Sequence, residues 1–227
     1  MNPAGVTTAL DAFIVSRART RRPRVCFVGT ASGDSSEYIA RFYRAYSALD
    51  CIPTDLTLIE SGLPRRPESS HDLPAFLAEQ DVLYVGGGNT ANMLAVWRAH
   101  DLDAQLRLAW GRGTILCGIS AGMVCWFDKG VTDSYGALDA LDDGLGFLPG
   151  SACPHYNGER RRPAAFHRML KDGELTDGYA ADDGVALVFD GPELAEVVAE
   201  RDDATAYRVS LEASGEVTER PLVTRRL

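Results

Sequence analysis

The sequence lacks the features that mark secreted, zinc-binding or membrane proteins. Its five cysteines are odd in number and form no CxxC pair, so neither a disulfide framework nor a zinc site is predicted. No run of about 18 apolar residues occurs, and the opening MNPAGVTTALDAFIVSRARTRR has no apolar core of the kind that a signal peptide needs. We therefore expect a cytoplasmic protein with no membrane segment and no metal.

Positive charge is also scarce. Lys and Arg number 23 against 32 Asp and Glu, which gives a formal net charge of -9. A nucleic-acid or anionic-membrane surface needs clustered basic residues, so neither kind of partner is expected. The length of 227 residues and the 45% of apolar residues suit one folded domain over residues 1–227. The oligomeric state is not encoded in any visible pattern, and a homodimer is one possible form.

What the chain does have is an alternation of short apolar runs and amphipathic stretches up to about Phe127. This alternation is typical of β-α-β units with a parallel sheet. Strands are predicted at residues 25–29, 82–85 and 114–119, with a weaker one at 57–59. We expect an α/β fold in three layers, in which helices flank a mostly parallel, flavodoxin-like central sheet.

Helices and loops are predicted between and after these strands. Asp34 is predicted to cap a helix that has Glu37 three positions later. Further helices are expected at residues 90–100, from about Ser120, and at 162–170. Residues 61–70 and 129–150 are predicted to be loops. Strands at 185–189, 194–199 and 207–211 would make the C-terminal part rich in β-structure.

The segment Gly118-Ile119-Ser120-Ala121-Gly122 fits the GxSxG pattern between a predicted strand and a predicted helix. Such a turn presents a nucleophilic serine, because glycines two positions to either side let the strand and the helix approach closely. N–H groups at the start of the helix stabilise developing negative charge. The alternative is that Ser120 only caps the helix, and the motif by itself does not decide between the two.

A second glycine-rich segment, GGGNT at residues 86–90, follows another predicted strand. It therefore lies at the same carboxyl edge of the sheet as Ser120, where ligands bind in open α/β sheets. We expect the N–H groups of Gly88 and Ala121 to form an oxyanion hole, with Gly87 and Asn89 lining the substrate site. The segment lacks the spacing and the lysine of phosphate-binding loops, although a simple glycine turn is an alternative.

A catalytic serine needs a base, and the chain offers four histidines. His71 lies in a polar loop, His100 closes a predicted helix and His167 falls in a basic helix. His155 ends a short apolar segment and enters a loop, where scaffolds present functional side chains. Elimination favours His155 as the general base.

The orienting acid and the substrate contacts are less well defined by the pattern. Asp133, Asp182 and Asp183 all lie near the ends of apolar segments, and spacing alone favours a turn role for Asp183. A dyad of Ser120 with Lys129 is conceivable. The triple arginine at residues 160–162 would suit a substrate carboxylate or simply begin a solvated helix.

Taken together and in this order, VGGGNT, GISAG and PHY resemble the peptidase E and cyanophycinase family of serine peptidases, over roughly residues 24–189. The resemblance implies a glutamine-amidotransferase-like fold without a metal or organic cofactor. It implies Ser120 as nucleophile, His155 as base, and Gly88 with Ala121 as the oxyanion hole. It also promotes Asp183, which falls where the family has a glutamate, so that a closer backbone would be needed for the shorter side chain to reach His155.

The resemblance extends to substrate recognition and to the N-terminus. Asp133 matches a further family aspartate, and Arg161 falls near a family arginine associated with an acidic substrate side chain. The opening MNPAGVTTALDAF lacks the strand with which relatives usually begin. Either a strand of the family sheet is missing from residues 1–22 or the chain starts late.

The expected activity is hydrolysis of short peptides, of dipeptidase or aminopeptidase type, through an acyl-enzyme. The alternative is a non-peptidase or non-catalytic protein of the same fold that binds a small carboxylated metabolite. An esterase of the α/β-hydrolase type is disfavoured, because there the acid precedes the histidine, whereas here His155 precedes Asp183.

Overall fold

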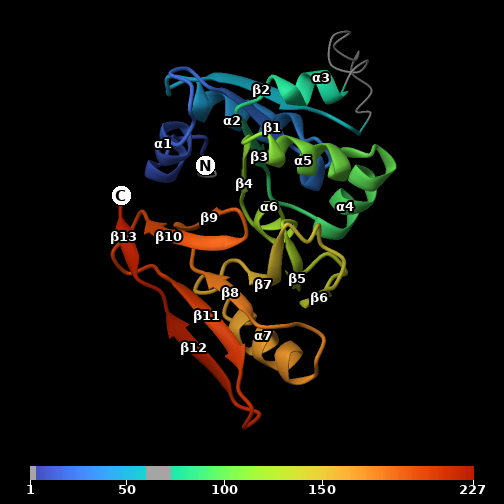
Figure 1. The fold of residues 1–227 in the computed structure, drawn as a ribbon, viewed down its shortest axis with the longest axis vertical. Coiled ribbons are helices and arrows are strands. Elements are labelled where there is room, and N and C mark those ends of the chain that lie inside the picture. The colour runs from blue at the N-terminus through green and yellow to red at the C-terminus, as the bar shows by residue number, and fades with distance from the viewer. Residues whose placement is uncertain (1–3, 60–72) are drawn as a thin grey trace. The chain divides into compact units, whose positions relative to one another are not determined.

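The computed structural model describes residues 4–59 and 73–227 (Figure 1). The chain divides into two compact units, Met1–Gly122 and Met123–Leu227, and each is described by itself below. The predicted loop at residues 61–70 and His71 lie outside the described residues.

The first unit is built on a four-stranded, wholly parallel sheet with the order β2-β1-β3-β4. Its strands are β1 (Arg24–Val28), β2 (Ile52–Leu56), β3 (Val82–Val85) and β4 (Ile115–Gly118). The predictions of a parallel sheet and of three of its strands are therefore confirmed. The strand predicted at 57–59 was wrong, because β2 ends at Leu56. Pro53 argues against a strand at this place in the sequence. The strand forms because β2 lies at the edge of the sheet, where proline is tolerated.

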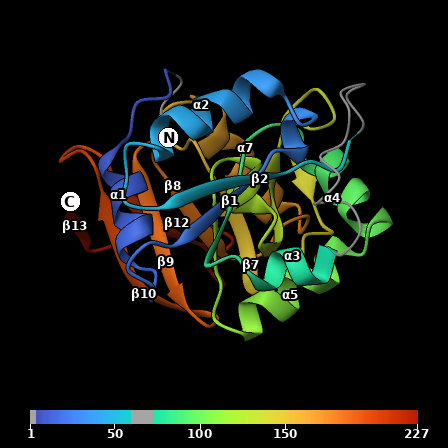
Figure 2. The same cartoon turned by 90° about the horizontal axis from the view of Figure 1, so that it is seen from above.

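The helices of the first unit cover both faces of this sheet. They are α1 (Ala9–Ser16), the 3-10 turn η1 (Thr30–Ser32), α2 (Ser36–Tyr46), α3 (Leu73–Ala78), α4 (Thr90–Ala99) and α5 (Leu102–Gly111). Figure 2 shows α2 on one side of β1 and β2, and α3 with α5 on the other. The three-layer arrangement expected from the sequence is thus confirmed.

An aromatic cluster joins α2 to the sheet. Phe42 stacks on Phe27 of β1 with ring centroids 5.0 Å apart and on Tyr46 with centroids 4.3 Å apart. All three rings are fully buried. Aromatic pairs at such separations stabilise a fold beyond the area that they bury. This packing fixes α2, and with it the side chain of Tyr38 one turn earlier.

Residues 4–23 contain α1 and no strand. Thr8 begins this helix in a capping box, because its side chain accepts the N–H of Asp11 while the Asp11 carboxylate accepts the N–H of Thr8. Asp11 is buried and also accepts a hydrogen bond from the hydroxyl of Tyr46 at 3.1 Å. Helix α1 was not predicted from the sequence.

Asp34 does not cap α2, and that prediction was wrong. Ser35 is the capping residue. Asp34 takes a left-handed conformation with φ 53°, and its carboxylate accepts the N–H groups of Leu58 and Ile59 at 2.6 and 2.7 Å. Burial raises the pKa of Asp34. Asp34 and Ser35 could each cap α2. Because the Asp34 carboxylate binds the segment after β2, Ser35 is the residue that caps the helix.

The second unit contains two sheets and α7 (Arg162–Lys171). The larger sheet has the order β12-β11-β8-β7-β5-β6, and the smaller has the order β13-β10-β9. Their strands are β5 (Phe127–Thr132), β6 (Asp139–Leu141), β7 (Leu148–Cys153), β8 (Gly178–Ala181), β9 (Val185–Asp190), β10 (Glu193–Ala199), β11 (Ala206–Leu211), β12 (Val217–Pro221) and β13 (Thr224–Arg226). The β-rich C-terminal part and the helix near residue 162 are confirmed.

The loop predicted at residues 129–150 was wrong in part, because this stretch holds most of β5, all of β6 and the start of β7. Because β5 contains Gly130, the sequence pattern did not indicate a strand there. The glycine is needed there, since a Cβ on Gly130 would lie 2.8 Å from the carbonyl oxygen of Ala152 on β7. Helix α6 (Ala121–Val124) carries the chain from the first unit into the second.

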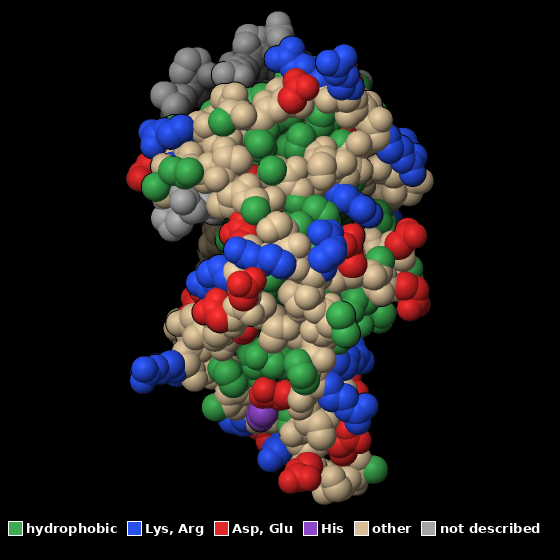
Figure 3. Space-filling model, turned by 90° about the vertical axis from the view of Figure 1, so that its left-hand side faces the viewer, with side chains coloured by type: hydrophobic (Ala, Val, Ile, Leu, Met, Phe, Trp, Pro, Cys, Tyr) green, Lys and Arg blue, Asp and Glu red, His purple; other side chains and the backbone are tan. Residues whose placement is uncertain are grey.

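On the face drawn in Figure 3, acidic and basic side chains are interspersed and do not gather into one basic patch. In the described part of the chain, no helix is both long enough and apolar enough to cross a membrane.

Candidate active site

Ser120 stands on a sharp turn between β4 and α6. Its φ is 56°, a left-handed conformation that costs an L-residue about 1–2 kcal/mol. The flanking glycines make the turn possible. A Cβ on either Gly118 or Gly122 would lie within 3.0 Å of the carbonyl oxygen of Val85 on the neighbouring strand β3. The close approach of strand and helix predicted for this motif is therefore present.

The glycine loop at residues 86–89 lies against this turn. A Cβ on Gly87 would be 3.2 Å from the Cβ of Ser120. Gly88 has φ 143°, and a Cβ there would collide with the carbonyl oxygen of Ala31. That same oxygen accepts the N–H of Asn89 at 2.8 Å, and Asn89 caps α4 with its side chain. The two glycine-containing motifs thus meet at the carboxyl edge of the sheet.

The N–H groups of this loop are not equivalent. That of Gly87 donates to the phenolic oxygen of Tyr38 at 3.2 Å. In contrast, no hydrogen bond joins the N–H of Gly88 or of Ala121 to another residue in the described part of the chain. These two are the donors expected for the oxyanion. No sequence pattern signals this contact of Tyr38 with the glycine loop.

In the second unit, His155 and Asp183 form a hydrogen-bonded pair. Nδ1 of His155 lies 2.6 Å from Oδ1 of Asp183, with side chains that are 24% and 48% exposed. When Nδ1 carries the proton that this bond shares, Nε2 keeps its lone pair and is able to accept a proton. His155 follows β7 directly after Pro154 and has φ 56°, so its side chain is held by an unusual backbone turn.

The other two candidate acids lie elsewhere. Asp182 is buried, and its carboxylate accepts the N–H of Thr205 at 3.1 Å. Desolvation raises the pKa of Asp182, partly offset by the backbone N–H groups of Thr205 and Asn157. Asp133 is exposed in the loop after β5. Among the three candidates, Asp183 is the one that contacts His155.

Two further hydrogen bonds join the segment that carries His155 to the segment that carries Asp183. The N–H of Tyr156 donates to the carbonyl oxygen of Ala181 at 3.0 Å. The N–H of Asp183 donates to Oδ1 of Asn157, also at 3.0 Å. These contacts fix the two loops against each other, independently of the bond between the imidazole and the carboxylate.

The remaining described histidines have structural partners. His100 is the C-cap residue of α4, where a histidine suits the helix dipole. His167 on α7 lies 2.6 Å from Oε1 of Glu219 on β12, which also accepts the hydroxyl of Tyr156 at 2.6 Å. His167 is thus a second histidine that pairs with a carboxylate, but it does so through Nε2, whereas His155 does so through Nδ1.

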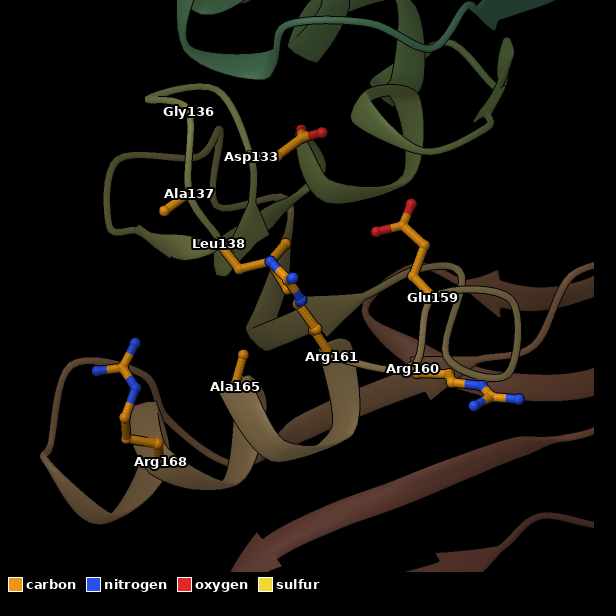
Figure 4. Close-up of a pocket in the computed structure, with 9 residues that line it drawn as sticks. All are labelled: Asp133, Gly136, Ala137, Leu138, Glu159, Arg160, Arg161, Ala165 and Arg168. Atoms are coloured by element: carbon orange, nitrogen blue, oxygen red, sulfur yellow. The ribbon is translucent and has the colours of Figure 1, made fainter.

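Asp133 and Arg161 line one open groove of about 560 Å³ in the second unit (Figure 4). Residues of the loop after β5, of the loop after His155 and of α7 make up its walls: Asp133, Gly136, Ala137, Leu138, Glu159, Arg160, Arg161, Ala165 and Arg168.

The three consecutive arginines have different environments. Arg162 is buried and donates to Glu159 at 2.8 Å and to the carbonyl oxygen of Val131 at 3.2 Å, so it supports the loop. Arg160 and Arg161 are exposed, and no ion pair joins either to another residue among those described. Figure 4 shows Arg161 beside Leu138, with Arg160 directed away from it.

The cysteine nearest the serine is part of the core. Cys117 lies in β4, its Sγ is 3.6 Å from the carbonyl oxygen of Leu83, and burial raises the pKa of its thiol to about 12. A thiol with so high a pKa is a poor nucleophile at neutral pH. Within residues 4–59 and 73–227, no group of three or more His, Cys, Asp and Glu side chains could hold a metal ion.

A parallel α/β sheet that presents a strained serine between two obligatory glycines is the framework of a serine hydrolase. Comparison with known proteins agrees. The sequence model of Peptidase family S51 matches residues 4–197, and the chain belongs to this family of serine-type peptidases.

The chain is also similar to a peptidase sequence and to solved peptidase structures. The chain is 49% identical over 219 residues to YgaJ, an uncharacterized peptidase of Bacillus subtilis, covering 96% of this chain and 91% of that protein. Among solved structures it resembles a peptidase E protein of Listeria monocytogenes, with TM-score 0.57, 18% identity and 96% of each chain covered. It also resembles a peptidase from an acI-B1 Actinobacterium, with TM-score 0.63, 17% identity, 95% of this chain and 85% of that one.

Proposed function

We propose that this peptidase hydrolyses short peptides through a covalent acyl-enzyme on Ser120, with His155 as general base and Asp183 as the acid that orients it. The observation that carries the proposal is the left-handed Ser120, since such strain persists only where the surrounding structure enforces it and is concentrated at functional sites.

The proposed reaction begins with attack of Ser120 Oγ on the peptide carbonyl carbon while Nε2 of His155 takes the hydroxyl proton. The resulting oxyanion is stabilised by the N–H groups of Gly88 and Ala121. His155 then gives its proton to the leaving amine as the C–N bond breaks. Water attacks the ester, His155 takes a proton from it, and the acid product leaves as Ser120 regains its hydrogen.

This mechanism assigns the nucleophile and the oxyanion donors to the first unit and the base and its acid to the second. In this mechanism Nε2 of His155 accepts the proton of Ser120 Oγ. The 2.6 Å bond between His155 and Asp183 supports it, because that bond leaves Nε2 as the nitrogen that accepts the proton.

We propose that the groove lined by Asp133 and Arg161 recognises the substrate. Asp133 supplies a carboxylate that suits a free α-amino group, and Arg161 supplies a guanidinium that suits a substrate carboxylate. Gly87 and Asn89 would line the site next to Ser120. Since the N–H of Gly87 already binds Tyr38, the contribution of Gly87 is close approach of the substrate rather than donation. This arrangement favours a dipeptidase or aminopeptidase.

We further propose that the enzyme acts in the cytoplasm. All five cysteines are free thiols, which fits a reducing compartment.

A fluorophosphonate probe tests the nucleophile. The wild-type chain is expected to be labelled once, and Ser120→Ala to lose the label without a change in its far-UV circular dichroism. His155→Ala is expected to be labelled far more slowly, since the base that activates the serine is gone. Labelling of Ser120→Ala at the wild-type rate would refute the assignment.

Specificity is tested with dipeptides and their N-acetylated forms. The unblocked dipeptides are expected to be cleaved and the acetylated ones to resist. Arg161→Ala is expected to raise KM for substrates with an acidic first residue. The matched control is Arg168→Ala, because Arg168 lines the same groove but already pairs with Asp172 and Glu174. Equal effects of the two variants would defeat the role of Arg161.

A further inference from the structure

The turn that follows His155 contains Gly158, whose missing side chain leaves room for the Asp183 carboxylate. A Cβ on Gly158 would come within 3.0 Å of Asp183 Oδ2, and 3.2 Å from its Cγ. The three nearest atoms to that Cβ all belong to this one carboxylate.

The backbone conformation itself does not demand glycine at this position. Gly158 is not among the glycines with positive φ in the described part of the chain, so an L-residue could adopt its φ without the cost of a left-handed turn. The space taken by the carboxylate is therefore the constraint.

The Asp183 carboxylate needs the space at Gly158 because its side chain is short. Asp183 has one methylene fewer than a glutamate, and its Oδ1 already binds Nδ1 of His155 at 2.6 Å. Its other oxygen must then lie towards the turn, where only a residue without a side chain leaves room. Asn157 ties the same turn to Asp183, because its Oδ1 accepts the N–H of Asp183 at 3.0 Å.

We propose that Gly158, together with Asn157, is a positioning element that seats the short carboxylate of Asp183 against His155. This inference rests on the proposed Ser120–His155–Asp183 mechanism, in which neither Gly158 nor Asn157 touches the substrate. A methyl group at position 158 displaces the carboxylate from the imidazole and leaves the remainder of the fold in place.

The consequence for stability separates Gly158 from the glycines around Ser120. At Gly118 and Gly122 the obstructing atoms belong mainly to backbone, which cannot yield without distorting the sheet. At Gly158 they are the end of one side chain that is 48% exposed, and that side chain can rotate towards water. Gly158→Ala therefore costs activity while the fold is kept.

The experiment uses the full chain with ¹⁵N-labelled histidine and compares four proteins: wild type, Gly158→Ala, Asp183→Ala and the double variant. Gly111→Ala is the matched control, because a Cβ there meets nothing within 4 Å. Two readouts are taken from each: the NMR signal of the His155 Nδ1 proton, and kcat and KM for a cleaved dipeptide. Urea unfolding checks that each variant folds.

In the wild type and in Gly111→Ala, the Nδ1 proton is expected at low field, as for a hydrogen bond to a carboxylate. Asp183→Ala and Gly158→Ala are both expected to lose this signal. Gly158→Ala is expected to lower kcat about tenfold, the effect of losing one charge-assisted hydrogen bond, with KM unchanged. In the Asp183→Ala background the same substitution is expected to change kcat less than about twofold, since the carboxylate that it displaces is already absent.

The inference is overturned if Gly158→Ala keeps the low-field proton, if the wild type lacks it, or if the substitution costs as much in the Asp183→Ala background as in the wild type. A low-field proton that depends on Gly158, in a protein that neither cleaves peptides nor reacts with a fluorophosphonate, would instead support the seating of Asp183 and refute the proposed function. The NMR readout therefore separates the two.

Discussion

Replacing Asp183 by asparagine is expected to slow the enzyme more than replacing it by alanine, although asparagine is the closer mimic in shape. The reason is the proton on the imidazole. Asparagine can donate its amide N–H to Nδ1 of His155, which places the imidazole proton on Nε2. In the proposed mechanism Nε2 accepts the proton of Ser120, and it would then already carry one. Alanine leaves Nδ1 to water and does not favour this tautomer.

The size of each effect follows from the exposure of the pair. A hydrogen bond to a charged group contributes about 1.5–3 kcal/mol, and about 1.4 kcal/mol is a factor of ten in rate. Because the side chain of Asp183 is 48% exposed, water screens the pair and the lower figure applies, so Asp183→Ala should cost about tenfold in kcat. Asp183→Asn should cost about 10³-fold, somewhat less than the 10⁴-fold that a wrong tautomer costs in a buried triad.

The assay is the rate of cleavage of one dipeptide, with the rate of fluorophosphonate labelling as a second measure of serine reactivity. Asp182→Asn is a suitable control, since that carboxylate binds Thr205 rather than His155. Equal rates for the asparagine and alanine variants at position 183, or a faster asparagine variant, would refute the tautomer argument.

Four further predictions concern the same region. Ser120→Gly should raise the free energy of unfolding by about 0.5–1 kcal/mol. The reason is that removing the cost of a left-handed L-residue, about 1–2 kcal/mol, exceeds the entropic cost of the more flexible unfolded chain, about 0.4–1 kcal/mol. A variant that is less stable in urea unfolding would contradict the strain at Ser120. Gly122→Ala should lower that free energy by about 1–3 kcal/mol, since its Cβ would meet the backbone of β3, and an unchanged urea midpoint would show that the turn can relax. Tyr38→Phe should lower kcat several-fold by releasing the glycine loop, while Tyr43→Phe, whose hydroxyl binds Asp55 on β2, should leave kcat unchanged; equal kinetics of the two variants would count against the loop contact. Burial raises the pKa of Asp182 in the folded state, so the contribution of this carboxyl to stability is full below its unfolded-state pKa and is lost as pH rises through its folded-state pKa. The free energy of unfolding of the wild type, relative to that of Asp182→Asn, should therefore be greater at pH 4 than at pH 7. Urea titrations at the two pH values that show the reverse would overturn that sign.

The sequence predicted the parts of the molecule that depend on local pattern. Strands β1, β3 and β4 are continuous apolar runs, and both glycine motifs follow such a run directly. Their meeting at one sheet edge follows from parallel pairing, in which Val85 lies opposite Gly118. The sequence therefore predicted that the two motifs lie at one edge of the sheet, whereas the particular contact between Gly87 and Ser120 is a finding of the structure.

The parts that escaped prediction depend on contacts between distant segments. Pro53 and Gly130 lie inside strands that local propensity argues against, because an edge position and a close neighbouring strand accept them. Asp34 is drawn away from the helix that it could cap by two N–H groups more than twenty positions later. Tyr38 and Gly158 belong to the site through neighbours 49 and 25 positions away, and no periodicity carries such information.

The groove has a consequence for protein engineering. Asp133, Arg160 and Arg161 are exposed, and substitutions at exposed positions usually change stability by no more than about 0.5 kcal/mol. A library that varies these three positions while keeping Gly88, Gly118 and Gly122 would therefore consist mainly of folded proteins. Selection from such a library for new peptide preferences could proceed without a parallel search for stabilising mutations.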